Sequence, residues 1–105
     1  MVELIAHLDG SNFEKELKDK EIAIVDFWAA WCGPCQMFGK VLEEFAKENQ
    51  NVYCAKVNVD EAQDLASKFG VMSIPTIMFF KKGKLVKTQV GMLPKTMLKQ
   101  IIDTL

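Results

Sequence analysis

Residues 21–29, EIAIVDFWA, form the segment that most restricts how this chain can fold. The run is almost continuously apolar and is bounded by polar residues, with Asp26 as a charged residue inside it. A strand with one face in water alternates apolar and polar side chains, whereas a strand covered on both faces reads as a continuous apolar run. We therefore expect residues 21–29 to be a strand inside a sheet that carries helices on both faces.

The rest of the chain alternates between strand and helix patterns. Short apolar runs predict further strands at residues 2–8, 51–59, 76–80 and 84–90. Apolar residues at helical spacing predict helices at residues 11–18, 34–49, 60–69 and 94–105. Gly83 marks a hairpin between the last two strands.

Several residues suit the ends of these helices. Ser11 and Glu14 have the spacing of a capping box, and Asp60 is expected to cap the third helix. Gly70 is expected to end that helix, and Pro94 suits the first position of the last one.

The order β-α-β-α-β-α-β-β-α places parallel crossovers first and an antiparallel hairpin last. It predicts an α/β fold in three layers, with a mixed central five-stranded sheet flanked by about four helices. The 105 residues are enough for one compact domain and too few for two, so we expect a single domain over residues 1–105.

Charge and hydropathy exclude several classes of partner. The formal net charge is −1. Nucleic acids and anionic membranes bind proteins through basic surfaces, so neither is expected as the main partner. No apolar run approaches the ~20 residues of a membrane span, and the N-terminus lacks the pattern of a secretory signal. We therefore expect a cytoplasmic monomer. In a reducing cytosol, a close pair of cysteines is more often catalytic or metal-binding than structural.

Residues 31–35, WCGPC, place two cysteines three positions apart where the 21–29 strand gives way to a helix. Pro34 suits the first turn of that helix, so Cys32 should lie at its N-terminus, where unpaired backbone N–H groups favour the thiolate. One helical turn then brings Cys35 beneath Cys32, close to the ~5.5–6 Å Cα separation of disulfides. The spacing predicts a pair that opens and closes as dithiol and disulfide, with Gly33 and Pro34 keeping the turn small and stiff.

A metal site is the competing interpretation of this pair. A zinc site needs about four ligands, usually Cys or His, and outside the pair the chain offers only Cys54 and His7. A cluster shared between two chains stays open but needs a dimer that the sequence does not indicate. A structural staple is disfavoured, because closing so short a loop removes little chain entropy. We expect no metal, Cys54 as a small buried hydrophobe with regulatory oxidation as the alternative, and His7 at a strand edge.

Five motifs occur in order along the chain: VDFWA (25–29), WCGPC (31–35), AKVNVD (55–60), SIPT (73–76) and VG (90–91). In this order and at these spacings, the chain resembles the thioredoxin family over its whole length. The resemblance implies the thioredoxin fold and a general protein-disulfide reductase and electron carrier, with Cys32 as nucleophile and Cys35 as resolving thiol. It also implies oxidised client proteins as partners, re-reduction by a thioredoxin reductase (an NADPH-linked flavoprotein), and no bound cofactor.

Asp26 either faces a pocket rim, where water would satisfy it, or is buried among its apolar neighbours. The uninterrupted apolar flanks favour burial, which would raise the pKa of its carboxyl group. An acid titrating near neutrality can take the proton of Cys35, and the resemblance implies this role. Lys56 matches a lysine close to that acid in the family, although strand alternation alone describes it equally well as a surface lysine. The resemblance further implies a cis bond before Pro75, beside the cysteine pair, which leaves the preceding backbone at Ile74 open to a client strand.

We expect a flat apolar docking surface around the pair, with Trp28 mainly in the core. Its expected members are Trp31, Gly33, Pro34, Ile74, Val90 and Gly91, with Met92 at the margin. The methionines are expected to fill the core. Lys40 stands where many family members have proline, so the helix should be straighter or should bend at Gly39.

Three functions remain compatible with these features. The first is a protein-disulfide reductase, and the second is a binding subunit of the same fold whose main role is redox-independent. The third is an oxidase or isomerase. Gly33 and Pro34 favour the reductase over the third, because oxidising relatives typically carry histidine between the cysteines.

Overall fold

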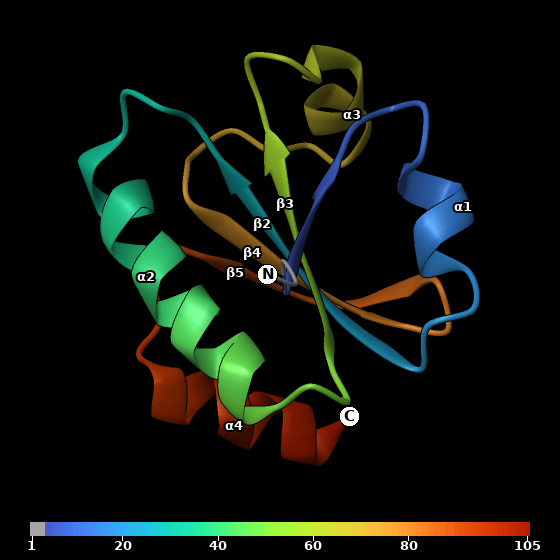
Figure 1. Cartoon of the computed structure of the whole chain (residues 1–105). Coiled ribbons are helices and arrows are strands. Elements are labelled where there is room, and N and C mark those ends of the chain that lie inside the picture. The colour runs from blue at the N-terminus through green and yellow to red at the C-terminus, as the bar shows by residue number, and fades with distance from the viewer. Residues whose placement is uncertain (1–3) are drawn as a thin grey trace.

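The computed structural model describes residues 4–105, and the chain follows the predicted order of elements (Figure 1). The strands are β1 (Ile5–Leu8), β2 (Ile22–Trp28), β3 (Tyr53–Asn58), β4 (Thr76–Lys81) and β5 (Lys84–Val90). The helices are α1 (Phe13–Leu17), α2 (Gly33–Glu48), α3 (Gln63–Lys68) and α4 (Lys95–Thr104). Every predicted element is present with slightly different ends, and residues 2–3 of the first predicted strand lie outside the described residues.

The strands form one mixed sheet in the order β1-β3-β2-β4-β5. β3 is parallel to both β1 and β2, whereas β4 is antiparallel to β2 and β5. β2 is therefore the central strand, and its residues 23–27 are all buried, as the apolar run predicted. The predicted five-stranded sheet with its flanking helices is confirmed.

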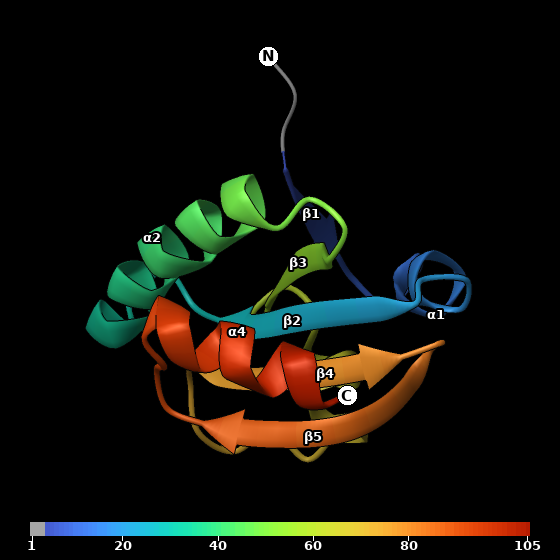
Figure 2. The same cartoon turned by 90° about the horizontal axis from the view of Figure 1, so that it is seen from below.

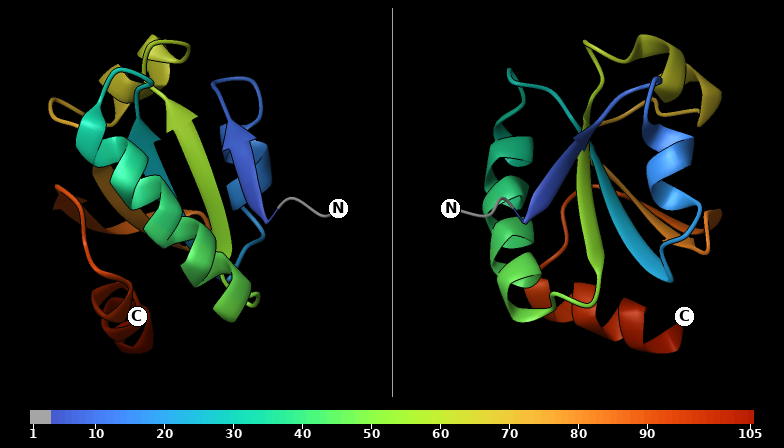
Figure 3. Two further views of the ribbon diagram at one scale, coloured as in Figure 1. Left: turned by 60° about the vertical axis from the view of Figure 1, so that its left-hand side comes forward. Right: turned by 45° about the vertical axis from the view of Figure 1, so that its right-hand side comes forward.

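The two faces of the sheet carry separate layers of helix, with α2 on one side of the strands and α1 on the other (Figure 3, right). α4 lies beside α2, and β5 forms the outer edge of the sheet (Figure 2). Ile24 packs in the core with α2 and α4, whereas Val25 packs in the core with α1 and α3. Because side chains alternate along a strand, Asp26 shares the face of Ile24, beneath the helix that begins at the cysteine pair.

No helix within residues 4–105 is long and apolar enough to cross a membrane.

The predicted capping box at α1 is wrong. Asn12 is the N-cap residue of α1, and none of the side chains in residues 4–105 caps the helix. The Asp9 carboxylate accepts hydrogen bonds from both the backbone N–H of Ser11, at 2.8 Å, and the Ser11 hydroxyl. This local turn engages Ser11 before the helix begins, so it cannot pair with Glu14.

The cap predicted for α3 is also wrong. Its N-cap residue is Ala62, and the Asp60 carboxylate is engaged elsewhere, by the side chain of Trp31. Gly70 follows the end of α3 with a left-handed backbone (φ +67°), as predicted. Pro94 is the N-cap residue of α4, one position before the one predicted.

Both the backbone conformation and the surroundings of residue 83 favour glycine at this position. Lys82 and Gly83 have φ of 51° and 82°, as in the two-residue turns whose twist suits a hairpin. A Cβ atom at residue 83 would also lie 3.0 Å from the Cα of Lys18. We expect Gly83→Ala to lower the free energy of unfolding by about 2–4 kcal/mol, as measured by urea denaturation.

Gly70→Ala is the matched control for this prediction. Residue 70 also has a positive φ, but its Cβ would meet open space, so we expect a loss of about 1 kcal/mol. Equal losses in the two variants would show that the close approach to Lys18 has no energetic weight.

Candidate active site

The two cysteines lie at the start of α2, as their spacing predicted. Cys32 is the N-cap residue, with an extended backbone, and Pro34 occupies the first turn. The Cys32 sulfur accepts a hydrogen bond from the backbone N–H of Cys35 at 3.2 Å. The two residues form a disulfide, with their Cα atoms 5.2 Å apart. Cys32 is 6% exposed and Cys35 1%, so an incoming sulfur reaches Cys32 more easily.

Ile74 lies directly against the disulfide and is followed in the chain by Pro75. The Sγ atom of Cys32 is 3.9 Å from the carbonyl oxygen of Ile74, and the Ile74–Pro75 peptide bond is cis, as the resemblance implied. The backbone N–H of Gly91 donates to the carbonyl oxygen of Pro75 at 2.8 Å, and Val90 is paired with Thr76 on β4. The fold therefore brings together segments that are far apart in the sequence.

The residues expected at the docking surface are accessible to different degrees. Trp31 is 72% exposed and Val90 is 60% exposed. Gly33 and Pro34 are exposed, whereas Ile74 and Gly91 are half-buried. We call the surface of these residues, with the exposed Met92, the docking face.

Asp60 is a site residue that the sequence analysis missed. Its Oδ2 atom accepts a hydrogen bond from Trp31 Nε1 at 2.9 Å, which holds the orientation of an otherwise exposed ring. The signal that would have located it is its position just after β3, since β2 and β3 are parallel and their carboxyl ends meet at one edge of the sheet.

Asp26 is completely buried, as predicted, and neither carboxylate oxygen has a hydrogen-bond partner among the described residues. Loss of hydration on burial raises the pKa of Asp26 to about 7, and the positive charge of Lys56 opposes this rise. Lys56 lies directly opposite Asp26 on the neighbouring strand β3. The carboxyl group therefore titrates in the range where it can exchange a proton at neutral pH.

The Lys56 ammonium group lies in a space between β3, Trp28 and α2. Its Nζ atom is 4.5 Å from the centroid of the Trp28 ring, and Trp28 is half-buried. A Cβ atom at Gly39 would come within 3.3 Å of the same Nζ. α2 continues without a break through Gly39 and Lys40, and the missing side chain at Gly39 leaves room for Lys56.

The expectation that the methionines fill the core is wrong for most of those described. Met78 is buried, whereas the other described methionines have exposed fractions of 96% (Met72), 61% (Met37), 39% (Met92) and 39% (Met97). A thioether is apolar but small and flexible, so sequence pattern alone does not separate core positions from surface positions.

The remaining cysteine and histidine lie away from the pair. Cys54 is buried, as expected, and burial raises the pKa of its thiol to about 12. His7 lies on the edge strand β1. Within residues 4–105, no three His, Cys, Asp or Glu side chains gather as metal ligands.

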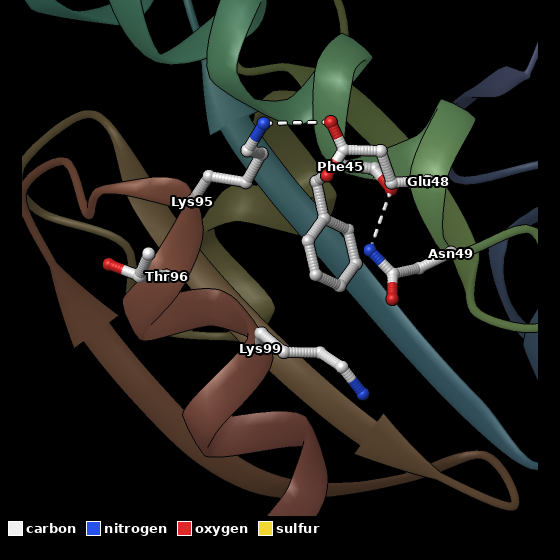
Figure 4. A pocket seen from close by; sticks show the side chains of 6 residues that line it. All are labelled: Phe45, Glu48, Asn49, Lys95, Thr96 and Lys99. Atoms are coloured by element: carbon white, nitrogen blue, oxygen red, sulfur yellow. Dashed lines mark hydrogen bonds and ion pairs between the residues drawn. The ribbon is translucent and has the colours of Figure 1, made fainter.

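A pocket of about 350 Å³ lies between the C-terminal end of α2 and the start of α4 (Figure 4). Lys95 Nζ and Glu48 Oε2 form an ion pair of 2.8 Å at its wall, and Asn49 donates to the carbonyl oxygen of Phe45 at 3.1 Å. This pocket is at the opposite end of α2 from the cysteine pair, so it does not contribute to the site.

Comparison with known proteins agrees with this geometry. The family model described as Thioredoxin matches residues 4–104. The chain is 48% identical to a thioredoxin of Alicyclobacillus acidocaldarius over 100 residues, which cover 93% of this chain and 95% of that protein. It is 46% identical to a thioredoxin of Haemophilus influenzae over 101 residues, 94% of each chain.

A solved structure shows the same architecture. A mutant thioredoxin from Halobacterium salinarum superimposes with a TM-score of 0.88 at 37% sequence identity, covering 94% of this chain and 88% of that one. The fold, the position of the cysteine pair and the match along nearly the whole chain lead to one assignment. The chain belongs to the thioredoxin family, and its chemistry is dithiol–disulfide exchange at Cys32 and Cys35.

Proposed function

We propose that the protein is a general protein-disulfide reductase in which Cys32 is the nucleophile and Cys35 the resolving thiol. The observation that carries this assignment is the unequal placement of the two sulfurs at the start of α2. Cys32 is the more accessible and accepts a backbone hydrogen bond, whereas Cys35 is enclosed. The whole chain, residues 1–105, would act as one domain and as a monomer.

In the first step the Cys32 thiolate attacks one sulfur of a client disulfide. The client S–S bond breaks, its second sulfur leaves as a thiolate, and a mixed disulfide joins Cys32 to the client. The N-terminus of α2 supports this step, because the Cys35 N–H and the helix dipole both favour negative charge on the Cys32 sulfur.

In the second step the Cys35 thiolate attacks the Cys32 sulfur and releases the second client thiol. Two electrons have then moved from the protein to the client, and the Cys32–Cys35 disulfide remains. We assign Asp26 as the group that takes the proton from Cys35. This role is supported by the burial of the carboxyl group on the α2 side of β2 and by its pKa of about 7. The positive charge of Lys56, on the neighbouring strand, favours the ionised form of Asp26 that accepts the proton.

The docking face would hold the client during both steps. Trp31 and Val90 supply exposed apolar contact, while Gly33, Pro34 and Gly91 allow close approach. The backbone at Ile74, beside the Cys32 sulfur and ahead of Pro75, would pair with an extended client segment as an added strand.

The reductase needs a source of electrons after each turnover. We propose a thioredoxin reductase, an NADPH-linked flavoprotein, as that partner, and oxidised proteins as the clients, with no cofactor bound to this chain. We also propose a cytoplasmic location, because a reducing compartment keeps such a pair supplied as the dithiol. Neither a nucleic acid nor a membrane is part of this assignment.

A turbidity assay of insulin reduction tests the proposed function. With a small dithiol as electron source, catalytic amounts of the protein should precipitate reduced insulin chains much faster than the dithiol alone. Equal rates with and without the protein would reject the reductase and favour a redox-independent binding role.

Cys35→Ser should accumulate a mixed disulfide with insulin. The variant keeps the proposed nucleophile but lacks the thiol that releases the client, so the covalent adduct persists until a small thiol is added. Non-reducing electrophoresis with mass spectrometry measures it. Cys54→Ser is the matched control, because it removes a buried cysteine outside the pair, and it should form no lasting adduct. The assigned order of attack would be overturned if Cys35→Ser formed no adduct, or if its adduct were attached through Cys54.

A further inference from the structure

Met72 is unusual among the large apolar side chains of this protein. It is 96% exposed, more than any other large hydrophobic residue described, including Trp31 at 72%. A single exposed apolar residue needs no explanation by itself, so its position decides whether it has a role.

That position is beside the docking face. Met72 lies in the connection between α3 and β4, two residues before Ile74, whose carbonyl oxygen is 3.9 Å from the Cys32 sulfur. A client strand that pairs with the backbone at Ile74 would run close to residue 72, because only Ser73 separates the two residues in the chain.

The backbone on both sides of Met72 is anchored. The N–H of Val71 donates to the carbonyl oxygen of Ala66 at 2.9 Å, and the Thr76 hydroxyl donates to the carbonyl oxygen of Ser73. The side chain is thus presented from a fixed segment with its thioether in water. An adaptable apolar side chain of this kind suits contact with clients of different sequence.

We propose that Met72 is a modification site, whose oxidation to the sulfoxide by a hydroperoxide weakens client docking and leaves the Cys32–Cys35 chemistry intact. The thioether sulfur attacks the terminal peroxide oxygen, and the O–O bond breaks. The sulfur gains one oxygen atom and gives up two electrons, and the hydroperoxide, after proton transfer, leaves as an alcohol or, for hydrogen peroxide, as water.

The expected consequence follows from the change in polarity. A sulfoxide replaces an apolar contact by a polar, hydrated and chiral one, which a client would have to desolvate. The KM for a protein client should rise about threefold to tenfold while kcat stays nearly constant. A small aromatic disulfide, which needs no extended docking contact, should be reduced at the same rate before and after oxidation.

The structure supplies internal references for the oxidation itself. Met72 should be oxidised first, ahead of Met37, while Met92 and Met97 at 39% exposure should follow and Met78 at 2% should resist. The protein is treated with hydrogen peroxide in its disulfide form, in which Cys32 and Cys35 are protected from oxidation, and the reaction is quenched with catalase. Peptide mass spectrometry then locates each sulfoxide, and a dithiol regenerates the cysteine pair before the insulin assay.

Two pairs of variants, at residues 72 and 97, assign the effect to one residue. Met72→Leu keeps an apolar side chain but cannot form a sulfoxide, so its KM should be the same before and after peroxide treatment, whereas Met97→Leu should remain as sensitive as the parent. Met72→Gln, a polar residue of similar length, should raise KM without any peroxide, and Met97→Gln should not.

This inference rests on the proposed reductase function, and the outcomes separate the two. If the parent protein fails to reduce insulin at all, the proposed function is rejected. If the parent is active but Met72 oxidation leaves KM unchanged, or if Met72→Leu stays sensitive to peroxide, or if Met97 is oxidised as fast as Met72, the role of Met72 is overturned and the reductase stands.

Discussion

Replacing Cys32 by serine should reduce insulin-disulfide reduction to the rate of the free dithiol alone. A serine hydroxyl at the start of α2 stays protonated at neutral pH, so no nucleophile remains at the accessible position. Cys35 does not compensate, because its side chain is only 1% exposed and sits behind the N-cap residue. The measurement is the insulin turbidity assay at equal protein concentrations.

Cys54→Ser is the control that matches this change in chemistry. Cys54 is buried on β3, and burial raises the pKa of its thiol to about 12, so it contributes no thiolate at neutral pH. Activity of Cys54→Ser should therefore equal that of the parent. Substantial activity in Cys32→Ser would mean that Cys35 or Cys54 can start the exchange, and the assigned roles would be wrong.

The overall fold could be predicted because its strongest signals are patterns of burial. The continuous apolar run of 21–29 identified the central strand, and alternating helix and strand patterns fixed the order of elements. The position of Cys32 at a helix N-terminus followed from Pro34 and from the length of the strand before it. These features depend on residues close together in the sequence.

The details that were missed depend on contacts between distant segments. Asp60, after the end of β3, accepts a hydrogen bond from Trp31 in the loop after β2. Its carboxylate is therefore engaged there and does not cap α3 as predicted. The turn at Asp9 displaced the capping box at Ser11 in the same way. The exposure of Met72 was also hidden, because an apolar residue type does not reveal on which side of a loop it will lie.

The stability of the oxidised protein should depend on pH through Asp26. The pKa of its carboxyl group is raised from 3.8 to about 7 in the folded protein, chiefly by burial. Below pH 3.8, the pKa of the unfolded chain, Asp26 is protonated in both states, and its contribution to the free energy of unfolding is fully present. As pH rises from 3.8 to about 7, only the unfolded chain loses the proton, so the free energy of unfolding falls by about 1.4 kcal/mol per pH unit, roughly 4 kcal/mol in all, and stays low above that range.

Asp26→Ala should remove this dependence. At pH 4 the variant should be less stable than the parent or similar to it, because it loses packing; toward pH 8 its relative stability should improve by about 4 kcal/mol. Urea denaturation of the disulfide form across pH 4–8 measures the difference, with both cysteines unable to titrate. Asp26→Asn, which keeps the shape without the proton, should show the same change with pH from a different starting value. Parallel stability curves for parent and variants would show that Asp26 is ionised normally in the fold.

The same variants separate the buried charge from its proposed chemical role. If Asp26 takes the proton from Cys35, a mixed disulfide formed at Cys32 should persist about a hundredfold longer in both Asp26→Ala and Asp26→Asn at neutral pH. Rapid acid quenching of single-turnover reactions with insulin measures this lifetime. If the mixed disulfide had a normal lifetime and the stability curves were as expected, Asp26 would be a buried carboxyl group with a raised pKa and no role in the exchange. Another group would then take the proton from Cys35. A long lifetime in both variants would instead show that the pH-dependent stability and the proton transfer have the same origin. Burial of Asp26 destabilises the folded protein above neutral pH, and the same burial raises the pKa to the value at which the carboxyl group can act as a base.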